Sequence, residues 1–227
     1  MKLIAILPMK ANSERVKGKN FKILGEKPLF KWILDTLLNV SEIDTIVINT
    51  DAREELYKNG LDENNKILIR DRREEICGDH TSMNLVIGDD VNSVDADIYL
   101  MTHTTNPFLT ENTIKKAIKT FKEALKNGEA DSLFTVNKVQ ERFYDKNAKA
   151  INHDPDNLIR TQDIDPWYKE NSNLYLFTKD SFKKTMARIG EKPIMIDTSF
   201  FESIDIDTME NWHLAEMVVK YEKYKDN

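Results

Sequence analysis

The sequence LIAILPMKANSERVKGKNFK, residues 3–22, joins a short apolar segment to a basic loop. Residues 3–7 are apolar without interruption, which is typical of a strand buried on both faces of a sheet. Ligands of parallel α/β sheets bind beyond the carboxyl ends of the strands. The stretch therefore predicts a buried first strand followed by a loop that can hold a ligand. Against one acid, Glu14, the loop carries the cations Lys10, Arg15, Lys17, Lys19 and Lys22.

The chemistry of this loop, residues 8–22, suits an anion. Ala11, Asn12, Ser13 and Gly18 are small, so backbone N–H groups can approach a bound group closely. Amides together with cations suit a triphosphate. The spacing matches neither the P-loop GxxxxGK[ST] nor the dinucleotide turn GxGxxG. A solvated basic loop without a ligand is the alternative reading.

Short β-branched segments alternate with amphipathic segments along the rest of the chain. This pattern predicts an α/β protein with a mostly parallel, doubly wound sheet. The polar, irregular stretch 139–170 interrupts the alternation, and we expect one domain over 1–227 with this stretch as an arm inserted in it. We expect strands at 3–7, 45–49, 66–69, 97–101, 132–136, 174–178, 194–197 and 203–206. We expect helices from Pro28, over 83–91, from the N-cap Thr110 to about Lys126, and after Asp207 or Thr208.

Composition limits the possible functions. The net charge is −6, so the chain as a whole is not expected to bind nucleic acid, and any anion site must be a local basic cluster. Cys77 is the only cysteine, which leaves no internal disulfide and no cysteine-rich metal site. Residues 1–9 do not have the pattern of a signal peptide, and no apolar run is long enough to span a bilayer. We expect a cytoplasmic protein that does not bind membranes.

The segment SIDIDT, residues 203–208, holds two carboxylates two positions apart. In an extended segment Asp205 and Asp207 point to the same side, about 6–7 Å apart. Two such oxygen donors suit Mg²⁺ (or Mn²⁺) bound against phosphate. Alternatively, Asp207 is a helix N-cap, because Glu210 three residues later resembles a capping box.

Two further stretches contain candidate ligand contacts. The mixed-charge run 70–75 follows a predicted strand, and Arg72 or Arg73 could reach a bound anion, although such runs are usually solvated. The segment YLMTHTTNPFL, residues 99–109, ends a predicted strand in hydrogen-bonding side chains that could contact a base or a sugar. An ordinary strand-to-helix turn is the alternative. His103 could act as a general base, but no neighbouring carboxylate or nucleophile in the sequence completes a triad.

Taken together and in order, these segments resemble the acylneuraminate cytidylyltransferases, over nearly the whole chain. Leu7-Pro8-Met9-Lys10 and Gly18-Lys19-Asn20 resemble the opening motif of that family, and Ser203–Thr208 its closing aspartate motif. The family often has arginine where Lys10 stands, glutamine where His103 stands and glycine where Ser172 stands. The intervening segments that also resemble the family are RREEICGD (72–79), HTTNP (103–107), RTQD (160–163) and ENSNLY (170–175).

The resemblance implies a nucleotidyltransferase (Rossmann-like) fold and transfer of a cytidylyl group from CTP to a nine-carbon acidic sugar, in a homodimer whose arm 139–170 completes the partner's site. It implies Mg²⁺ on Asp205 and Asp207, and catalytic roles for Lys19, Asp207 and Lys10. The implied nucleotide contacts are Lys10, Ala11, Asn12, Ser13, Arg15, Lys19, Asn20, Arg72 and Ser82. The implied sugar contacts, or contacts near the dimer partner, are His103, Thr104, Thr105, Arg160, Gln162, Asn171 and Tyr175.

Three alternatives remain open at the level of the sequence. A related branch that uses the eight-carbon sugar Kdo usually has proline where Asn20 stands, so Gly18-Lys19-Asn20 favours the nine-carbon branch. A nucleotidyltransferase that uses another sugar or another NTP is the second alternative. A non-catalytic nucleotide-binding protein on the same fold is the third, and the presence of Lys19, Asp205 and Asp207 counts against it.

Overall fold

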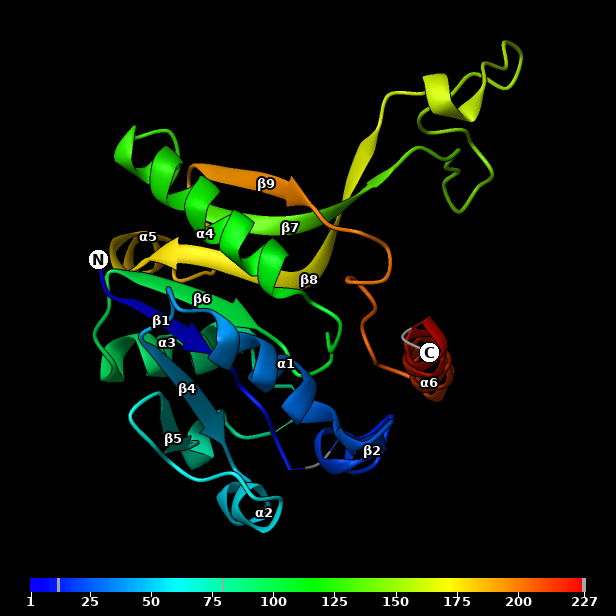
Figure 1. The fold of residues 1–227 in the computed structure, drawn as a ribbon. Helices are drawn as coiled ribbons and strands as arrows, with labels where there is room; N and C mark the ends of the chain where they lie inside the picture. The colour runs from blue at the N-terminus through cyan, green and yellow to red at the C-terminus, as the bar shows by residue number, and fades with distance from the viewer. Residues whose placement is uncertain (12, 79, 226–227) are drawn as a thin grey trace.

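A computed structural model describes residues 1–11, 13–78 and 80–225, and in this part of the chain the centre is a seven-stranded sheet (Figure 1). The strand order is β5-β4-β1-β6-β8-β7-β9. β8 is antiparallel to both of its neighbours, and the remaining pairs are parallel. The strands are β1 (Leu3–Ile6), β4 (Thr45–Thr50), β5 (Ile67–Asp71), β6 (Ile98–Thr102), β7 (Ser132–Val139), β8 (Trp167–Thr178) and β9 (Pro193–Asp197).

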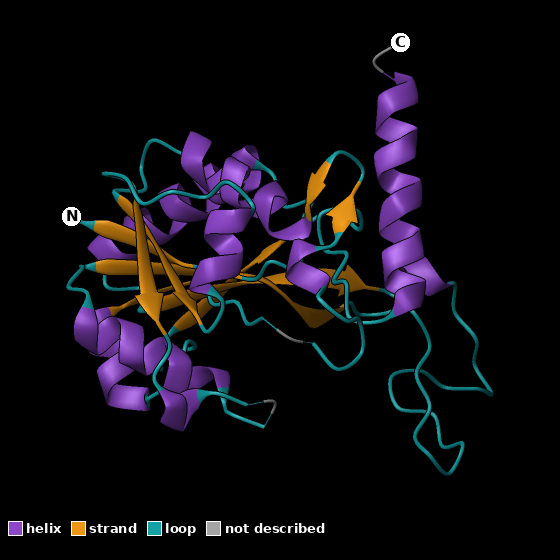
Figure 2. Cartoon of the chain, turned by 90° about the horizontal axis from the view of Figure 1, so that it is seen from below, coloured by secondary structure: helices purple, strands orange, loops and turns teal. Residues whose placement is uncertain are grey.

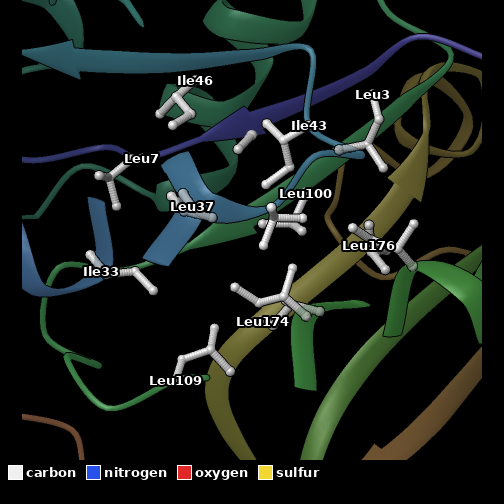
Figure 3. Packing of buried hydrophobic residues seen from close by; sticks show 14 of the residues in the cluster. Leu3, Leu7, Ile33, Leu37, Ile43, Ile46, Leu100, Leu109, Leu174 and Leu176 are labelled. Carbon is white, nitrogen blue, oxygen red and sulfur yellow. The ribbon is translucent and has the colours of Figure 1, made fainter. Parts of the chain in front are cut away.

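Helices cover both faces of the sheet, as the edge-on view in Figure 2 shows. One face packs against α1 (Leu29–Asn39) and α4 (Glu111–Lys126), through the apolar core drawn in Figure 3. The opposite face packs against α3 (Met83–Ser93) and α5 (Lys179–Thr185). The remaining elements are α2 (Arg53–Lys58), α6 (Met209–Lys225), the hairpin β2 (Ile23–Leu24) and β3 (Lys27–Pro28), and the 3-10 turns η1 (Lys19–Phe21), η2 (Glu74–Ile76) and η3 (Thr161–Asp163).

The predicted α/β alternation is confirmed, and the differences lie at particular segments. The Thr110 hydroxyl accepts a hydrogen bond from the Thr113 N–H and caps α4 as predicted. Pro28 precedes α1 as its N-cap residue and does not lie in the first turn. The predicted strand 203–206 is wrong, because this segment is irregular. The Ile206 N–H donates to the Thr105 carbonyl at 2.9 Å, beyond the end of β6, and the Asn137 side chain of β7 donates to the Ser203 hydroxyl at 2.9 Å.

A third apolar cluster joins the two ends of the chain. Trp212 and Val219 of α6 pack with Val16 of the first loop, and Ile204 and Ile206 belong to the same cluster. These side chains are buried because the alternating apolar residues of 203–208 point inward against α6. The packing therefore brings the aspartate segment next to the basic loop that follows β1.

The arm projects from the sheet between β7 and β8 (Figure 1). The two strands stay paired as far as Val139 and Trp167, so the irregular part of the arm is residues 140–166. Tyr144, Ile151 and Trp167 are exposed, whereas Ile164 is buried. Among the described residues, no helix combines the length and the apolar composition that a membrane span requires.

Candidate active site

A cavity of about 470 Å³ lies at the carboxyl ends of β1 and β6. The first loop, the residues after β6 and the aspartate segment all contribute to its wall, so segments far apart in the sequence meet in one place. Of the residues implicated by the sequence, those that line it are Lys10, Ser13, Arg15, Lys19, Asn20, Arg72, His103, Thr104, Thr105, Asp205 and Asp207.

Gly18 directs Lys19 into this cavity. The backbone of Gly18 has φ +60°, a left-handed conformation that suits glycine, and the chain then enters η1. The Lys19 Nζ donates to the Ile206 carbonyl at 2.6 Å and to Asp207 Oδ1 at 3.2 Å. Burial lowers the pKa of Lys19, and the carboxylate of Asp207 partly offsets this. Lys19 is therefore a largely desolvated cation, whose field acts more strongly on a bound phosphate than it would in water.

Asp207 lies between two cations of the first loop. In addition to its contact with Lys19, its Oδ2 pairs with Arg15 Nη2 at 3.0 Å. The cap of α6 is supplied by a different residue, because the Thr208 hydroxyl accepts from the Asn211 N–H at 3.2 Å. Asp207 thus holds Arg15 and Lys19 of the first loop at the cavity.

Asn20 clamps the first loop to the end of β6. Its Nδ2 donates to the Lys10 carbonyl at 2.8 Å, and its Oδ1 accepts from the Thr104 hydroxyl at 2.6 Å. Both side chains are buried. A proline could make neither contact through its side chain, so Asn20 positions the backbone of Lys10 at the cavity wall.

Arg72 supports the first loop at Met9, next to β4. It donates to the Asn49 side chain at 2.9 Å and to the Met9 carbonyl at 3.2 Å. Asn49 in turn donates to Asp90 at 2.8 Å, and Arg70 pairs with Asp89 at 3.0 Å and with Asp90. Burial lowers the pKa of Arg72 and raises that of Asp90 to about 6. The orientation of Arg72 therefore depends on a buried polar network under β4.

His103 is a neutral imidazole in this environment. Burial and the neighbouring charge of Arg188 lower the pKa of His103 to about 3. The ring contacts Arg188 Nη1 through Nε2 at 3.4 Å. With so low a pKa, His103 is a poor general base near neutral pH, and it is suited to hydrogen bonding instead.

The two carboxylates fit a divalent cation. Asp205 Oδ1 is buried without a hydrogen-bond partner, and burial raises the pKa of Asp205. Asp207 lines the same cavity. In the described residues no group of three or more His, Cys, Asp or Glu is placed to hold a metal, so further ligands would come from phosphate and water. Such a mixed set is typical of Mg²⁺.

The structure places the remaining predicted contacts outside the cavity. The Ala11 N–H donates to Asp51 at 2.7 Å, and Asn171 is held by Thr135 and Thr198 inside the sheet. Ser82 is the N-cap residue of α3, Tyr175 is buried in the core, and Arg160 and Gln162 lie on the arm. Asn12 lies outside the described residues.

Sequence reasoning missed Arg188, Ser172 and Glu14 as wall residues of the cavity. Ser172 has φ +56°, a left-handed conformation that favours glycine. The family resemblance places a glycine at this position, so the replacement marked Ser172 as a residue of unusual backbone conformation. Arg188 lies in the connection between α5 and β9, and no motif marks it.

Comparisons with known proteins agree with this site. The chain is 26% identical to the CMP-N,N'-diacetyllegionaminic acid synthase of Legionella pneumophila, over 97% of both chains. It is 24% identical to a Helicobacter pylori protein named pseudaminic acid cytidylyltransferase and UDP-2,4-diacetamido-2,4,6-trideoxy-beta-L-altropyranose hydrolase, over 97% of this chain and 43% of that one.

A solved structure of CMP:2-keto-3-deoxy-manno-octonic acid synthetase complexed with CTP superposes with a TM-score of 0.68 at 14% identity, over 98% of this chain and all of that one, and shows the same fold. The family model described as cytidylyltransferase matches residues 4–225. That match spans the first loop, the end of β6 and the aspartate segment, which together form the cavity, and the protein belongs to the cytidylyltransferase family.

Proposed function

We propose that this enzyme transfers the cytidylyl group of CTP to a nine-carbon acidic 2-keto sugar, a nonulosonic acid, and releases pyrophosphate. The observation that carries the proposal is the cavity in which Lys19 and Arg15 of the basic loop meet the carboxylate of Asp207. The names of the Legionella and Helicobacter relatives, which refer to legionaminic and pseudaminic acids, support the class of sugar.

In this reaction the anomeric hydroxyl oxygen of the sugar attacks the α-phosphorus of CTP, and the bond from that phosphorus to the pyrophosphate oxygen breaks. Lys10, Arg15 and Lys19 neutralise the negative charge that develops on the phosphates. We assign Asp207 the proton of the hydroxyl, through a bound water, because the low pKa of His103 makes that residue a poor base. Asp205 and Asp207 would hold Mg²⁺ or Mn²⁺, which supplies charge neutralisation at the phosphates.

Incubation with each of the four NTPs and a panel of 2-keto acid sugars tests this proposal. We expect pyrophosphate release and a CMP-sugar product, detected by mass spectrometry, with CTP and a nonulosonic acid. Higher kcat/KM with Kdo would assign the eight-carbon branch. Nucleotide binding without pyrophosphate release from any combination would show a non-catalytic protein.

We further propose that the enzyme works as a homodimer joined through the arm. The exposed apolar side chains Tyr144, Ile151 and Trp167 support this, because a solitary arm would leave them in water. A second cavity of about 860 Å³ lies at the root of the arm, and Phe143 and Phe200 are among the residues that line it. A symmetric pair could bury this surface against its twin.

Light scattering at assay concentration tests the dimer. We expect twice the monomer mass, and a monomer after residues 140–166 are replaced by a short turn. A fully active monomer of the intact chain would contradict the dimer, and a dimer that survives loss of the arm would contradict the role of the arm.

A further inference from the structure

We propose that Arg188 binds the carboxylate of the acidic sugar and so selects 2-keto acids as acceptors. This inference rests on the proposed function of the same cavity and adds a specificity-determining residue to it. Arg188 lies in the connection between α5 and β9, and its side chain lines the cavity on the side of β6 and β8.

The guanidinium of Arg188 packs against two neighbouring side chains. Its Cζ lies 3.8 Å from the centre of the Tyr175 ring, which is itself completely buried, and Nη1 lies 3.9 Å from Met101 Sδ. Stacking on an immobile aromatic ring fixes the plane of the guanidinium and lowers the entropy lost when it binds a planar anion. The side chain is still 21% exposed, so the ring and the cavity wall do not enclose it completely.

Arg188 forms a long ion pair with Glu170 and a neutral contact with His103. Nη2 lies 3.3 Å from Glu170 Oε1, and Nη1 lies 3.4 Å from His103 Nε2. Charge-assisted hydrogen bonds are about 2.7–2.9 Å long, so neither contact has the length of a strong pair. Glu170 also accepts from the Tyr175 hydroxyl, and the imidazole of His103 is neutral. A ligand carboxylate would therefore be a better acceptor for Nη1 than the imidazole now beside it.

Three other cations that line the cavity contact groups away from the side of β6 and β8 where Arg188 lies. Arg15 and Lys19 pair with Asp207, and Arg72 donates to Asn49 and a backbone carbonyl. Arg160, which the sequence resemblance placed near the sugar, lies on the arm with a side chain 72% exposed and pairs with Asp163. Of the three arginines that line this chain's own cavity, Arg188 is the one on the side of His103 and Ser172, away from the cations of the first loop.

Binding at the carboxylate would also position the reacting atom. In a 2-keto acid sugar the carboxylate carbon is bonded to the anomeric carbon, which bears the attacking hydroxyl. A fixed carboxylate therefore restricts that hydroxyl to a small volume, and such restriction lowers the barrier to attack. Loss of Arg188 should consequently lower kcat as well as weaken sugar binding.

The experiment compares Arg188→Met and Arg188→Lys with wild type. The acceptor is a nonulosonic acid that wild type uses, supplied as its free acid and as its neutral methyl ester. Lys184→Met is the matched control, because it removes an exposed cation from the same region. We expect Arg188→Met to raise the KM of the acid by about 10–100-fold, the range for hydrogen bonds to a charged group, with the KM of CTP unchanged. Arg188→Lys should lie in between, and Lys184→Met should match wild type.

The comparison of acid and ester distinguishes recognition of the sugar carboxylate by Arg188 from a role of Arg188 in packing the cavity wall. Wild type should prefer the acid over the ester, and Arg188→Met should lose that preference. A retained preference, or an equal rise in the KM of CTP, would overturn the assignment. If Arg188→Met fails to fold, the same two criteria apply to Arg188→Gln, which also removes the charge and keeps a polar side chain. Failure of wild type to form a CMP-sugar from any 2-keto acid would instead overturn the proposed function, and the inference with it.

Discussion

Replacing Asp207 by Asn removes the negative charge that joins the two ends of the chain at the cavity. In the structure Asp207 pairs with Arg15 at 3.0 Å and with Lys19 at 3.2 Å. The amide keeps the shape of the side chain and one hydrogen-bond acceptor. The substitution therefore tests charge and leaves packing almost unchanged.

The effect on stability follows from the exposure of the three side chains. Arg15 is 65% exposed, so its pair contributes less than about 1 kcal/mol. The Lys19 side chain is only 9% exposed and would keep the Ile206 carbonyl as a partner. Removing one partner of a fully buried ion pair lowers the free energy of unfolding by about 3–5 kcal/mol. Because Asp207 is 38% exposed, we expect a smaller loss of about 1–2 kcal/mol. The melting temperature should fall by about 2–8 °C.

The effect on catalysis should be much larger. Asp207→Asn removes an anionic oxygen donor and the group that positions Lys19, and we expect kcat to fall by about 10²–10³-fold. Asp205→Asn is the matched control. It should also lose turnover, but burial raises the pKa of Asp205, so replacing its charge by an amide should leave the neutral-pH stability unchanged or higher. Lys19→Met combined with Asp207→Asn should recover stability and not turnover.

Thermal unfolding and steady-state kinetics at limiting Mg²⁺ are the assays. Near-wild-type turnover in both aspartate variants would refute the metal assignment. Strictly additive losses of stability in the Lys19→Met and Asp207→Asn double-mutant cycle would refute the proposed coupling between the two residues.

Three further predictions follow from the same geometry. Lys19→Ala should raise the KM of CTP far more than that of the sugar, and unchanged CTP kinetics would remove the first loop from the site. His103→Gln should keep the shape of the kcat/KM profile between pH 5 and 8, because the pKa of His103 is about 3; a lost inflection near pH 6.5 would show that the imidazole titrates during turnover. Burial raises the pKa of Asp90 from 3.8 to about 6, so the folded state binds more protons than the unfolded state between these values. Denaturant unfolding should therefore show wild type gaining stability relative to Asp90→Asn as the pH falls from 7 to 4, and a constant difference would contradict the raised pKa.

Much of the sheet could be predicted because its strands are short runs of apolar residues between polar turns. Residues 45–49 and 97–101 correspond to β4 and β6 within one residue at each end, and the N-cap Thr110 begins α4. Residues 203–206 alternate polar and apolar side chains, a pattern that also predicts a strand, and yet they form no strand. The spacing of apolar residues indicates which side chains are buried, but not what buries them. Here α6 buries Ile204 and Ile206, and no neighbouring strand among the described residues pairs with their backbone.

The composition of the candidate site could be predicted more readily than the role of each side chain. Asn20 was expected at the nucleotide, and the structure shows it clamping the Lys10 backbone to Thr104. Asn171 was expected at the sugar, and its amide is engaged inside the sheet. A motif identifies residues that share a region, but only the hydrogen-bond partners distinguish a wall residue from a supporting one.

The sequence by itself determined the α/β class, the basic loop after the first strand, and the two aspartates near the end of the chain, because each depends on residues close together along the chain. The tertiary structure alone decided that Lys19 meets Asp207, 188 positions away, and that Arg188 faces the same cavity as His103. Those contacts depend on the order of strands in the sheet and on the packing of α6 over the first loop. No local pattern encodes that arrangement, because it results from burial of apolar surface contributed by the whole chain.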